Sequence, residues 1–342
     1  MEDGNKFRKQ PDAFNPAEAL KLSLLDPSSQ VDAPPTILTI NGKSCMKARS
    51  LSVLIGKAKA RKGFFINAIV TAAASGRCSV DGIEGKFNNG KSGVIVFDTE
   101  QGAYWAQLAH KRIIKAIGTE RPPNLQYYDL QQYTPAQRLE MVNAAITEHE
   151  NLSMVVIDGI RDLISSINDE VQATEMCSNI LRWCATKEIH VVTVLHQNKN
   201  DQNARGHIGT ELINKAETVI SIAKEKDETI STVKLEFSRD RDFQPFSFCI
   251  DDEGLPRLSD YEQPATTKKK EDDISRFQYV FKDHPRLNNA LVVKKYMEAS
   301  GWIESTANKH IATALVSGII VKDEQGNYSL PKTESENETL SF

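Results

Sequence analysis

The chain has 342 residues, a net charge of −4, 40% hydrophobic residues and 26% charged residues, which is typical of a globular protein with one α/β domain and a small additional module. No apolar run approaches the roughly 20 residues that a membrane helix needs, and the N-terminal sequence lacks the apolar core of a signal peptide. The five cysteines form no CxxC pair, which favours reduced thiols in a cytoplasm over a disulfide framework or zinc site. Any contact with nucleic acid must come from local basic patches.

Residues 1–35 are predicted to form an N-terminal arm that carries one short helix, preceded by a polar, disordered stretch at 1–12. Asn15 is placed to cap the helix and Pro16 to occupy its first turn. The apolar positions that follow are Ala19, Leu20, Leu22, Leu24 and Leu25. This helix either packs on its own domain or docks on a neighbouring subunit, and the sequence leaves both open.

The next segments predict a hairpin and then a phosphate-binding loop. Thr36–Ile40 forms a strand that turns at Asn41-Gly42. An apolar strand from Leu51 to Ile55 then leads through a basic loop into a helix from Phe64 to Ala74, which Gly76 would end. Backbone N–H groups at a helix N-terminus can face an anion, and a lysine can reach the outer phosphates.

This loop departs from the usual pattern G-x-x-x-x-G-K-[ST] at two positions. Arg61 stands in place of the second glycine, and Gly63 in place of the hydroxyl that binds Mg²⁺. The alternative is a basic turn before a helix. The candidate nucleotide-binding residues are Gly56, Lys57, Ala58, Lys59, Ala60, Arg61, Lys62 and Gly63.

Downstream, apolar strands alternate with helices, which predicts an α/β fold with a mostly parallel sheet covered by helices on both faces. We expect this domain to span residues 36–258, with loops at 77–92 and 199–210. The expected strands are Val94–Phe97, Leu125–Leu130, Met154–Ile157, Ile189–Leu195, Val219–Ala223, Val233–Phe237 and Phe246–Ile250, and the expected helices are Tyr104–Ile117, Thr134–His149 and Thr174–Lys187.

The C-terminal part is predicted to be a separate module. Residues 259–273 are polar and are interpreted as a linker, and 274–331 contain three helix patterns followed by a hairpin, which is the outline of a winged helix. The acidic tail at 332–342 is expected to be disordered.

Five polar residues follow strands in the order that an oligomeric ATPase needs. Glu100 can orient a water molecule for attack on the γ-phosphate, and Asp158 can coordinate Mg²⁺. Gln197 can sense the γ-phosphate, and Arg239 and Arg241 can reach a neighbouring subunit's nucleotide as arginine fingers. Each also has an ordinary interpretation as a polar residue that ends a strand, opens a helix or lies on a solvated hairpin.

Together with the phosphate loop, these residues resemble the RecA-like hexameric ATPases of the RepA and DnaB helicase type. The strand-end Glu100 and Asp158, the ending His196-Gln197-Asn198 and the run Ser238-Arg-Asp-Arg241 carry the resemblance, which covers about Thr36 to Leu258. The resemblance implies a RecA-like fold, ATP with Mg²⁺ as cofactors, a homo-oligomer with six members, and single-stranded DNA bound in the ring channel. The family usually has Thr where this chain has Gly63, which affects Mg²⁺ more than binding through Lys62.

Two regions are candidates for DNA contact. In the family, loops matching Gly159–Ala173 and Lys199–Thr210 line the ring, and the second carries Lys199, Arg205 and His207. In the winged helix, the third helix would meet duplex DNA through Ser305, Asn308 and Lys309, although many winged helices bind proteins instead.

The sequence therefore predicts a nucleotide-dependent, DNA-binding ATPase, a helicase or loader, acting in replication, mobilisation or excision of a mobile genetic element. One alternative is a degenerate phosphate-loop protein that binds DNA without ATP turnover, as an initiator or regulator. A third alternative is a transcriptional or initiation regulator in which the ATPase domain only oligomerises.

Overall fold

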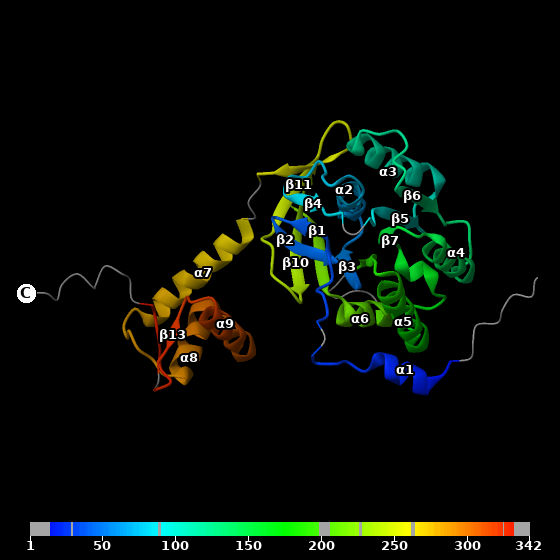
Figure 1. Cartoon of the computed structure of the whole chain (residues 1–342). Helices are drawn as coiled ribbons and strands as arrows, with labels where there is room; N and C mark the ends of the chain where they lie inside the picture. Colours follow the sequence, from blue (N-terminus) through cyan, green and yellow to red (C-terminus); the bar gives the residue numbers. More distant parts are fainter. Residues whose placement is uncertain are drawn as a thin grey trace, which may run out of the picture. The chain divides into compact units, whose positions relative to one another are not determined.

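Figure 1 shows the computed structural model of the chain, which describes residues 14–28, 30–87, 90–197, 206–225, 228–260, 264–323 and 325–331. The chain divides into two compact units, Met1–Ser259 and Asp260–Phe342. None of the helices in the described ranges combines the length and the apolar character that crossing a membrane requires.

The larger unit contains, within its described residues, a nine-stranded sheet in the order β12-β11-β10-β9-β3-β8-β7-β5-β6. The strands from β9 to β6 in this order run parallel, and β10, β11 and β12 extend the sheet antiparallel. This confirms the predicted α/β class with a mostly parallel sheet. The strands are β3 (Ser50–Gly56), β5 (Gly93–Asp98), β6 (Leu125–Asp129), β7 (Leu152–Asp158), β8 (His190–His196), β9 (Thr218–Lys224), β10 (Ile230–Ser238), β11 (Phe246–Ile250) and β12 (Pro256–Ser259).

Helices cover both faces of this sheet because its parallel strands are apolar on both sides. In β5, Val94 and Val96 enter the core on one face, whereas Ile95 and Phe97 enter the core on the other. The first core includes α2 (Lys62–Ser75) and the small sheet of β1 (Thr36–Ile40), β2 (Lys43–Lys47) and β4 (Ile83–Gly85), with Ile113 of α3 (Gly102–Ile117). The second includes α4 (Pro135–Glu148), α5 (Glu170–Lys187) and α6 (Gly206–Lys215) (Figure 1).

Four short segments differ from the sequence prediction. The loop expected at 77–92 contains β4, which pairs with β1, and β12 lies where no strand was expected. The loop expected at 199–210 gives way to α6 from Gly206. The segment after β7 contains a 3-10 helix, η1 (Ile160–Leu163). Each is too short, or too polar, for its hydrophobic periodicity to be recognised, and tertiary pairing stabilises it.

The smaller unit contains α7 (Pro264–Phe281), α8 (Asn289–Ser300) and α9 (Glu304–Val316), followed by the hairpin of β13 (Val321–Lys322) and β14 (Tyr328–Ser329). Its core consists of residues from these helices and the hairpin, such as Phe277, Tyr296 and Ile311. The expected helix at 274 begins at Pro264, so most of the segment interpreted as a linker, 259–273, is helical. The segment is lysine-rich and polar, so its sequence carries no apolar periodicity from which a helix could be recognised. The predicted tail at 332–342 lies outside the described residues.

The N-terminal helix α1 (Pro16–Ser23) forms as expected, with the Asn15 side chain accepting hydrogen bonds from the N–H groups of Ala17 and Glu18. None of its residues is buried. Leu20, Leu22, Leu24 and Leu25 are 73, 83, 82 and 80% exposed. The sequence left open whether α1 packs on its own domain or docks on a neighbouring subunit. In the structure of the single chain, α1 does not pack on its own domain. Residues 1–12 lie outside the described ranges.

Candidate nucleotide site

The candidate site lies at the edge of the sheet where the parallel strands end. In the register of the sheet, Gly56 of β3 lies beside His196 of β8, and Asp98 of β5 lies beside Asp158 of β7. A pocket of about 270 Å³ opens at this edge and is lined by the phosphate loop, the ends of these strands and one face of α3. The fold thus brings Lys62, Glu100 and Asp158 together from three distant parts of the sequence.

Arg61 of the phosphate loop departs from the family pattern in a way that the structure explains. Arg61 has a φ of 69°, the left-handed conformation that usually requires glycine. Its guanidinium donates to the hydroxyl of Ser231 and to the carbonyl oxygen of Glu228, and these contacts with β10 and the turn before it offset the backbone strain. Gly56 is needed for packing, because an added Cβ would lie 2.4 Å from the carbonyl oxygen of Ile222 on β9.

Lys62 occupies the base of the pocket. Its ammonium donates to the carbonyl oxygens of Gly56 at 2.9 Å and Lys57 at 3.1 Å, and it lies 3.2 Å from Nδ1 of His196. Burial lowers the pKa of Lys62, and the charges of Asp158 and Glu100 oppose this effect. In this arrangement the ammonium of Lys62 donates its hydrogen bonds to carbonyl oxygens of its own loop. These are the hydrogen bonds that it would otherwise donate to a phosphate group.

Glu100 is held by His196. Nε2 of His196 lies 3.4 Å from each carboxylate oxygen of Glu100. Because Nδ1 faces the ammonium of Lys62, which only donates, Nδ1 accepts and Nε2–H donates to Glu100. The hydrogen bond from His196, with the positive charges of Lys62 and Arg161 nearby, lowers the pKa of Glu100. The carboxylate is therefore ionised at neutral pH, as a base that orients water must be.

Asp158 and Asp98 form a pair of neighbouring carboxyl groups. Burial raises the pKa of Asp158 to about 7, and the charges of Asp98 and Glu100 add to this effect. Burial also raises the pKa of Asp98, although its side chain accepts hydrogen bonds from the backbone N–H groups of Glu100 and Gln101 and from the hydroxyl of Tyr127. Asp98 thereby fixes the turn that presents Glu100.

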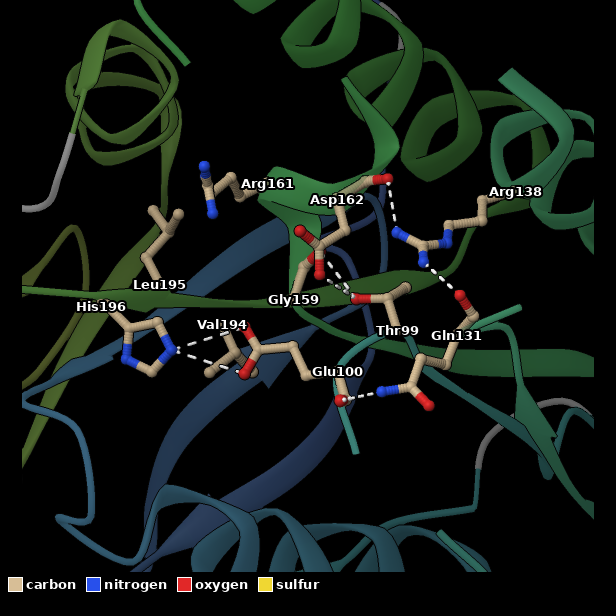
Figure 2. A pocket seen from close by; sticks show the side chains of 10 residues that line it. All are labelled: Thr99, Glu100, Gln131, Arg138, Gly159, Arg161, Asp162, Val194, Leu195 and His196. Atoms are coloured by element: carbon tan, nitrogen blue, oxygen red, sulfur yellow. Dashed lines mark hydrogen bonds and ion pairs between the residues drawn. The ribbon is translucent and has the colours of Figure 1, made fainter. Parts of the chain in front are cut away.

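A second cavity, of about 420 Å³, shares Glu100 and His196 with the nucleotide pocket. Figure 2 shows the ten side chains that line it, with His196 directed at Glu100. Arg138 donates to the carbonyl oxygens of Leu130, Gln131 and Asp162, so its role here is to hold the wall of the cavity.

The residues present do not fit a metal ion held by the protein. Gly63 has no hydroxyl, and a Cβ added there would meet nothing within 4 Å. Asp158 is the remaining predicted ligand, and the described residues contain no group of three or more His, Cys, Asp or Glu side chains placed to hold a metal. A phosphate-bound Mg²⁺ would find carboxylates here, but it would not find the Ser or Thr hydroxyl that usually follows the lysine. We therefore assign no step to the metal.

The other candidate ATPase residues do not line the pocket. The backbone N–H of Gln197 donates to the carbonyl oxygen of Gly56, and Gln197 is not among the residues that line either cavity. Arg239 and Arg241 follow β10, which runs antiparallel to β9, so they lie at the opposite edge of the sheet from the phosphate loop. The backbone N–H of Arg239 donates to the carbonyl oxygen of Glu217, before the start of β9.

The candidate DNA-binding residues are only partly described. Lys199 and Arg205 lie outside the described residues. His207 lies on the first turn of α6 and is exposed. In the smaller unit, an exposed face of α9 carries Ser305, Asn308 and Lys309, while Ala307, Ile311 and Ala314 of the same helix are buried.

Sequence reasoning assigned no role in the site to His196, Asp98 or Arg161. His196 and Asp98 are the last residues of apolar strands, so the strand-end argument that selected Asp158 also applied to them. Arg161 follows Gly159 in a segment considered only for DNA contact, and its effect on Glu100 depends on the path of η1.

Comparisons with known proteins find a matching family and similar solved structures. A family model described as an AAA domain matches residues 16–202, more than half of the chain. The search of curated proteins gives no match. Among solved structures, the chain is similar to a crystal structure of the RadB recombinase, with 13% sequence identity and a TM-score of 0.43, over 65% of this chain and 94% of that chain.

Proposed function

The chain belongs to the AAA domain family, and from this premise we propose that it is a nucleotide-dependent ATPase of the RepA/DnaB type that binds DNA as a homo-oligomer. The observation that carries the proposal is the grouping of Lys62, Glu100, Asp158 and His196 around one pocket at the end of the parallel strands. ATP is the proposed cofactor, and a role in replication, mobilisation or excision of a mobile element follows from the resemblance to RepA and DnaB helicases.

The contacts of Lys62 support a simple sequence of events in this pocket. Lys62 leaves the carbonyl oxygens of Gly56 and Lys57 and donates to the β- and γ-phosphates, which are stronger acceptors because they are charged. Nδ1 of His196 then loses its contact with Lys62, while Nε2–H keeps Glu100 in place. Glu100 accepts a proton from the water that attacks the γ-phosphate.

The proposed DNA contacts use both units. Lys199, Arg205 and His207 follow β8, whose end contributes His196 to the nucleotide pocket. We therefore expect the binding of single-stranded DNA by these residues to depend on the nucleotide bound in the pocket. The smaller unit is proposed to be a winged-helix domain at 274–331 because three helices precede its hairpin. Its α9 presents polar side chains on an exposed face, as binding to duplex DNA requires.

The ATPase rate of the purified full-length protein, with and without single-stranded DNA, tests the proposal. We expect turnover that DNA stimulates. Lys62→Ala should weaken binding of a labelled ATP analogue, and Glu100→Gln should keep binding and abolish turnover. Unchanged affinity in the Lys62 variant would contradict the phosphate-loop assignment, and a wild-type rate in the Glu100 variant would contradict its role as the base.

A second candidate function is nucleotide-dependent DNA binding without turnover, as an initiator or regulator. Gly63 favours it, because the loop lacks the hydroxyl that usually binds Mg²⁺. Binding of the ATP analogue with no release of phosphate, in the presence of Mg²⁺ and DNA, would select this alternative. Gly63→Thr is sterically allowed, since an added Cβ has open space. A gain of turnover in this variant would show that the missing hydroxyl is the reason why the wild type does not hydrolyse ATP.

A further inference from the structure

Arg112 occupies a fixed position at the wall of the nucleotide pocket, yet no sequence pattern selects it. It lies on α3 and lines the same pocket as Lys62 and Gly63. Its guanidinium carbon is 4.9 Å from the ring centroid of Phe64, the residue after Gly63. On another side it meets the turn that leads into β12, where a Cβ added at Gly254 would lie 2.9 Å from Nε of Arg112. The ring and the turn thus hold the guanidinium beside the first turn of α2.

The donors of Arg112 are available to a ligand. Among the described residues no hydrogen bond or ion pair of the Arg112 side chain is found, and its cation–π contact with Phe64 leaves the N–H groups free to donate. Two of the other cations that line the pocket differ, because Lys62 donates to Gly56 and Lys57 and Arg61 donates to Ser231 and Glu228. A phosphate group entering the pocket would meet Arg112 without first breaking a protein contact.

The pocket needs this charge because it lacks the usual partner of a metal ion. A nucleoside triphosphate brings several negative charges, which a partly buried site must neutralise. In most phosphate loops, Mg²⁺ held by the hydroxyl after the lysine supplies part of that charge. Gly63 has no side-chain oxygen with which to hold the ion.

Resting on the proposed nucleotide-binding function, we propose that Arg112 takes over the charge-neutralising role of the loop-bound metal. The chain therefore binds a nucleoside triphosphate through Lys62 and Arg112, with little dependence on Mg²⁺. The fork of N–H groups on Arg112 suits phosphate oxygens. The rigid clamp between Phe64 and the turn at Gly254 lowers the entropy that the side chain loses on binding.

The test is a fluorescence titration of the full-length protein with a fluorescent ATP analogue, in Mg²⁺ and again in EDTA. For the wild type we expect affinities that agree within about threefold in the two media. Arg112→Gln should weaken binding by roughly tenfold to a hundredfold in both, as loss of a hydrogen bond to a charged group does. Arg112→Lys should retain part of the affinity, because it keeps the charge and loses the fork.

Two further variants sharpen the comparison. Lys115→Gln removes the same charge from the same helix, but Lys115 pairs with Glu253 and does not line the pocket, so its affinity should equal that of the wild type. Gly63→Thr restores the hydroxyl in open space, and its affinity should become higher in Mg²⁺ than in EDTA. The Mg²⁺ comparison on the wild type does not depend on the folding of any variant.

The outcomes separate this inference from the proposed function. If wild-type binding collapses in EDTA, or if Arg112→Gln binds like Lys115→Gln while Lys62→Ala is impaired, the role of Arg112 is refuted and nucleotide binding stands. If the wild type binds no analogue in either medium, the proposed function fails and the inference fails with it.

Discussion

Single residues of this site are tuned by their burial and by the charges around them. The backbone of Arg61 has a left-handed conformation that costs roughly 1–2 kcal/mol in an L-residue. The hydrogen bonds of its side chain to Ser231 and Glu228 offset this cost. Asp158 and His190 show how burial affects ionisation. Burial raises the pKa of the acid and lowers that of the base, so the two residues should affect stability with opposite dependence on pH.

Asp158→Asn should stabilise the nucleotide-free protein increasingly as the pH rises from about 4 to 7. The pKa of Asp158 is raised from 3.8 to about 7, so the folded state keeps a proton that the unfolded state releases, and wild-type stability falls through this window. Complete loss of that proton corresponds to about 4 kcal/mol. Urea unfolding of both proteins at several pH values measures the difference. A difference in unfolding free energy that is constant with pH would contradict the shift.

For His190 we expect the opposite dependence of stability on pH. Its Nδ1–H donates to the carbonyl oxygen of Lys47 and its Nε2 accepts from the hydroxyl of Ser52, and burial lowers its pKa from 6.5 to about 4. The unfolded state binds a proton that the folded state excludes, so stability falls as the pH drops through this interval, by about 3 kcal/mol. In urea unfolding from pH 7 to 4, His190→Gln should lose less stability than the wild type. Parallel curves for the two proteins would show that His190 is not the group responsible.

At the scale of elements, α1 differs from the other helices of the larger unit. Helices α2 and α5 bury most of one face or more, whereas α1 buries no residue and exposes four leucines in and after it. An isolated helix of eight residues is marginal in water, and its Asn15 cap alone does not make it stable. A second copy of the chain is the partner that the proposed homo-oligomer supplies.

Replacing Leu20 and Leu24 by Ser should therefore weaken self-association. Burial of a leucine side chain contributes about 2 kcal/mol, so loss of two should raise the dissociation constant by more than about a hundredfold. Sedimentation equilibrium measures this, with Glu18→Ala on the same helix as the control because Glu18 is polar and exposed. An unchanged distribution of species in the double variant would mean that α1 does not join the subunits.

At the scale of the whole molecule, the direction of β10 decides which nucleotide Arg239 and Arg241 can reach. β10 starts at the same edge of the sheet as the phosphate loop and ends at the other, and its nine residues span roughly 25–30 Å at about 3.3 Å per residue. Neither arginine lines the pocket of its own chain. A catalytic role for them thus requires the next subunit of a homo-oligomer, where a guanidinium can stabilise transition-state charge.

Arg241→Ala should leave nucleotide affinity nearly intact and abolish turnover. Mixing it with Lys62→Ala should restore part of the activity, because roughly a quarter of the interfaces in a random equal mixture contain both intact residues. ATPase assays on oligomers shown to be mixed test this, in the Gly63→Thr background if the wild type does not turn over. An exposed Arg–Asp hairpin without a catalytic role predicts little effect of the single change and no rescue.

Local chemistry determined what could be derived from the sequence alone. The apolar strands, the capping box at Thr134 and the Gly76 and Gly118 caps of α2 and α3 are local signals, and the structure contains all of them. The mostly parallel sheet followed from the alternation of strands and helices, because parallel strands need crossover connections.

Tertiary structure alone decided which side chains meet. His196 reaches both Lys62 and Glu100 because β8 lies between β3 and β7. The order of strands in a sheet cannot be derived from the local periodicity of the sequence. Arg112 faces the pocket because of the contact between α3 and the Phe64 ring of α2, two segments about 50 residues apart. The pKa values of Asp158 and His190 depend on desolvation, which exists only once the whole sheet and its covering helices exclude water.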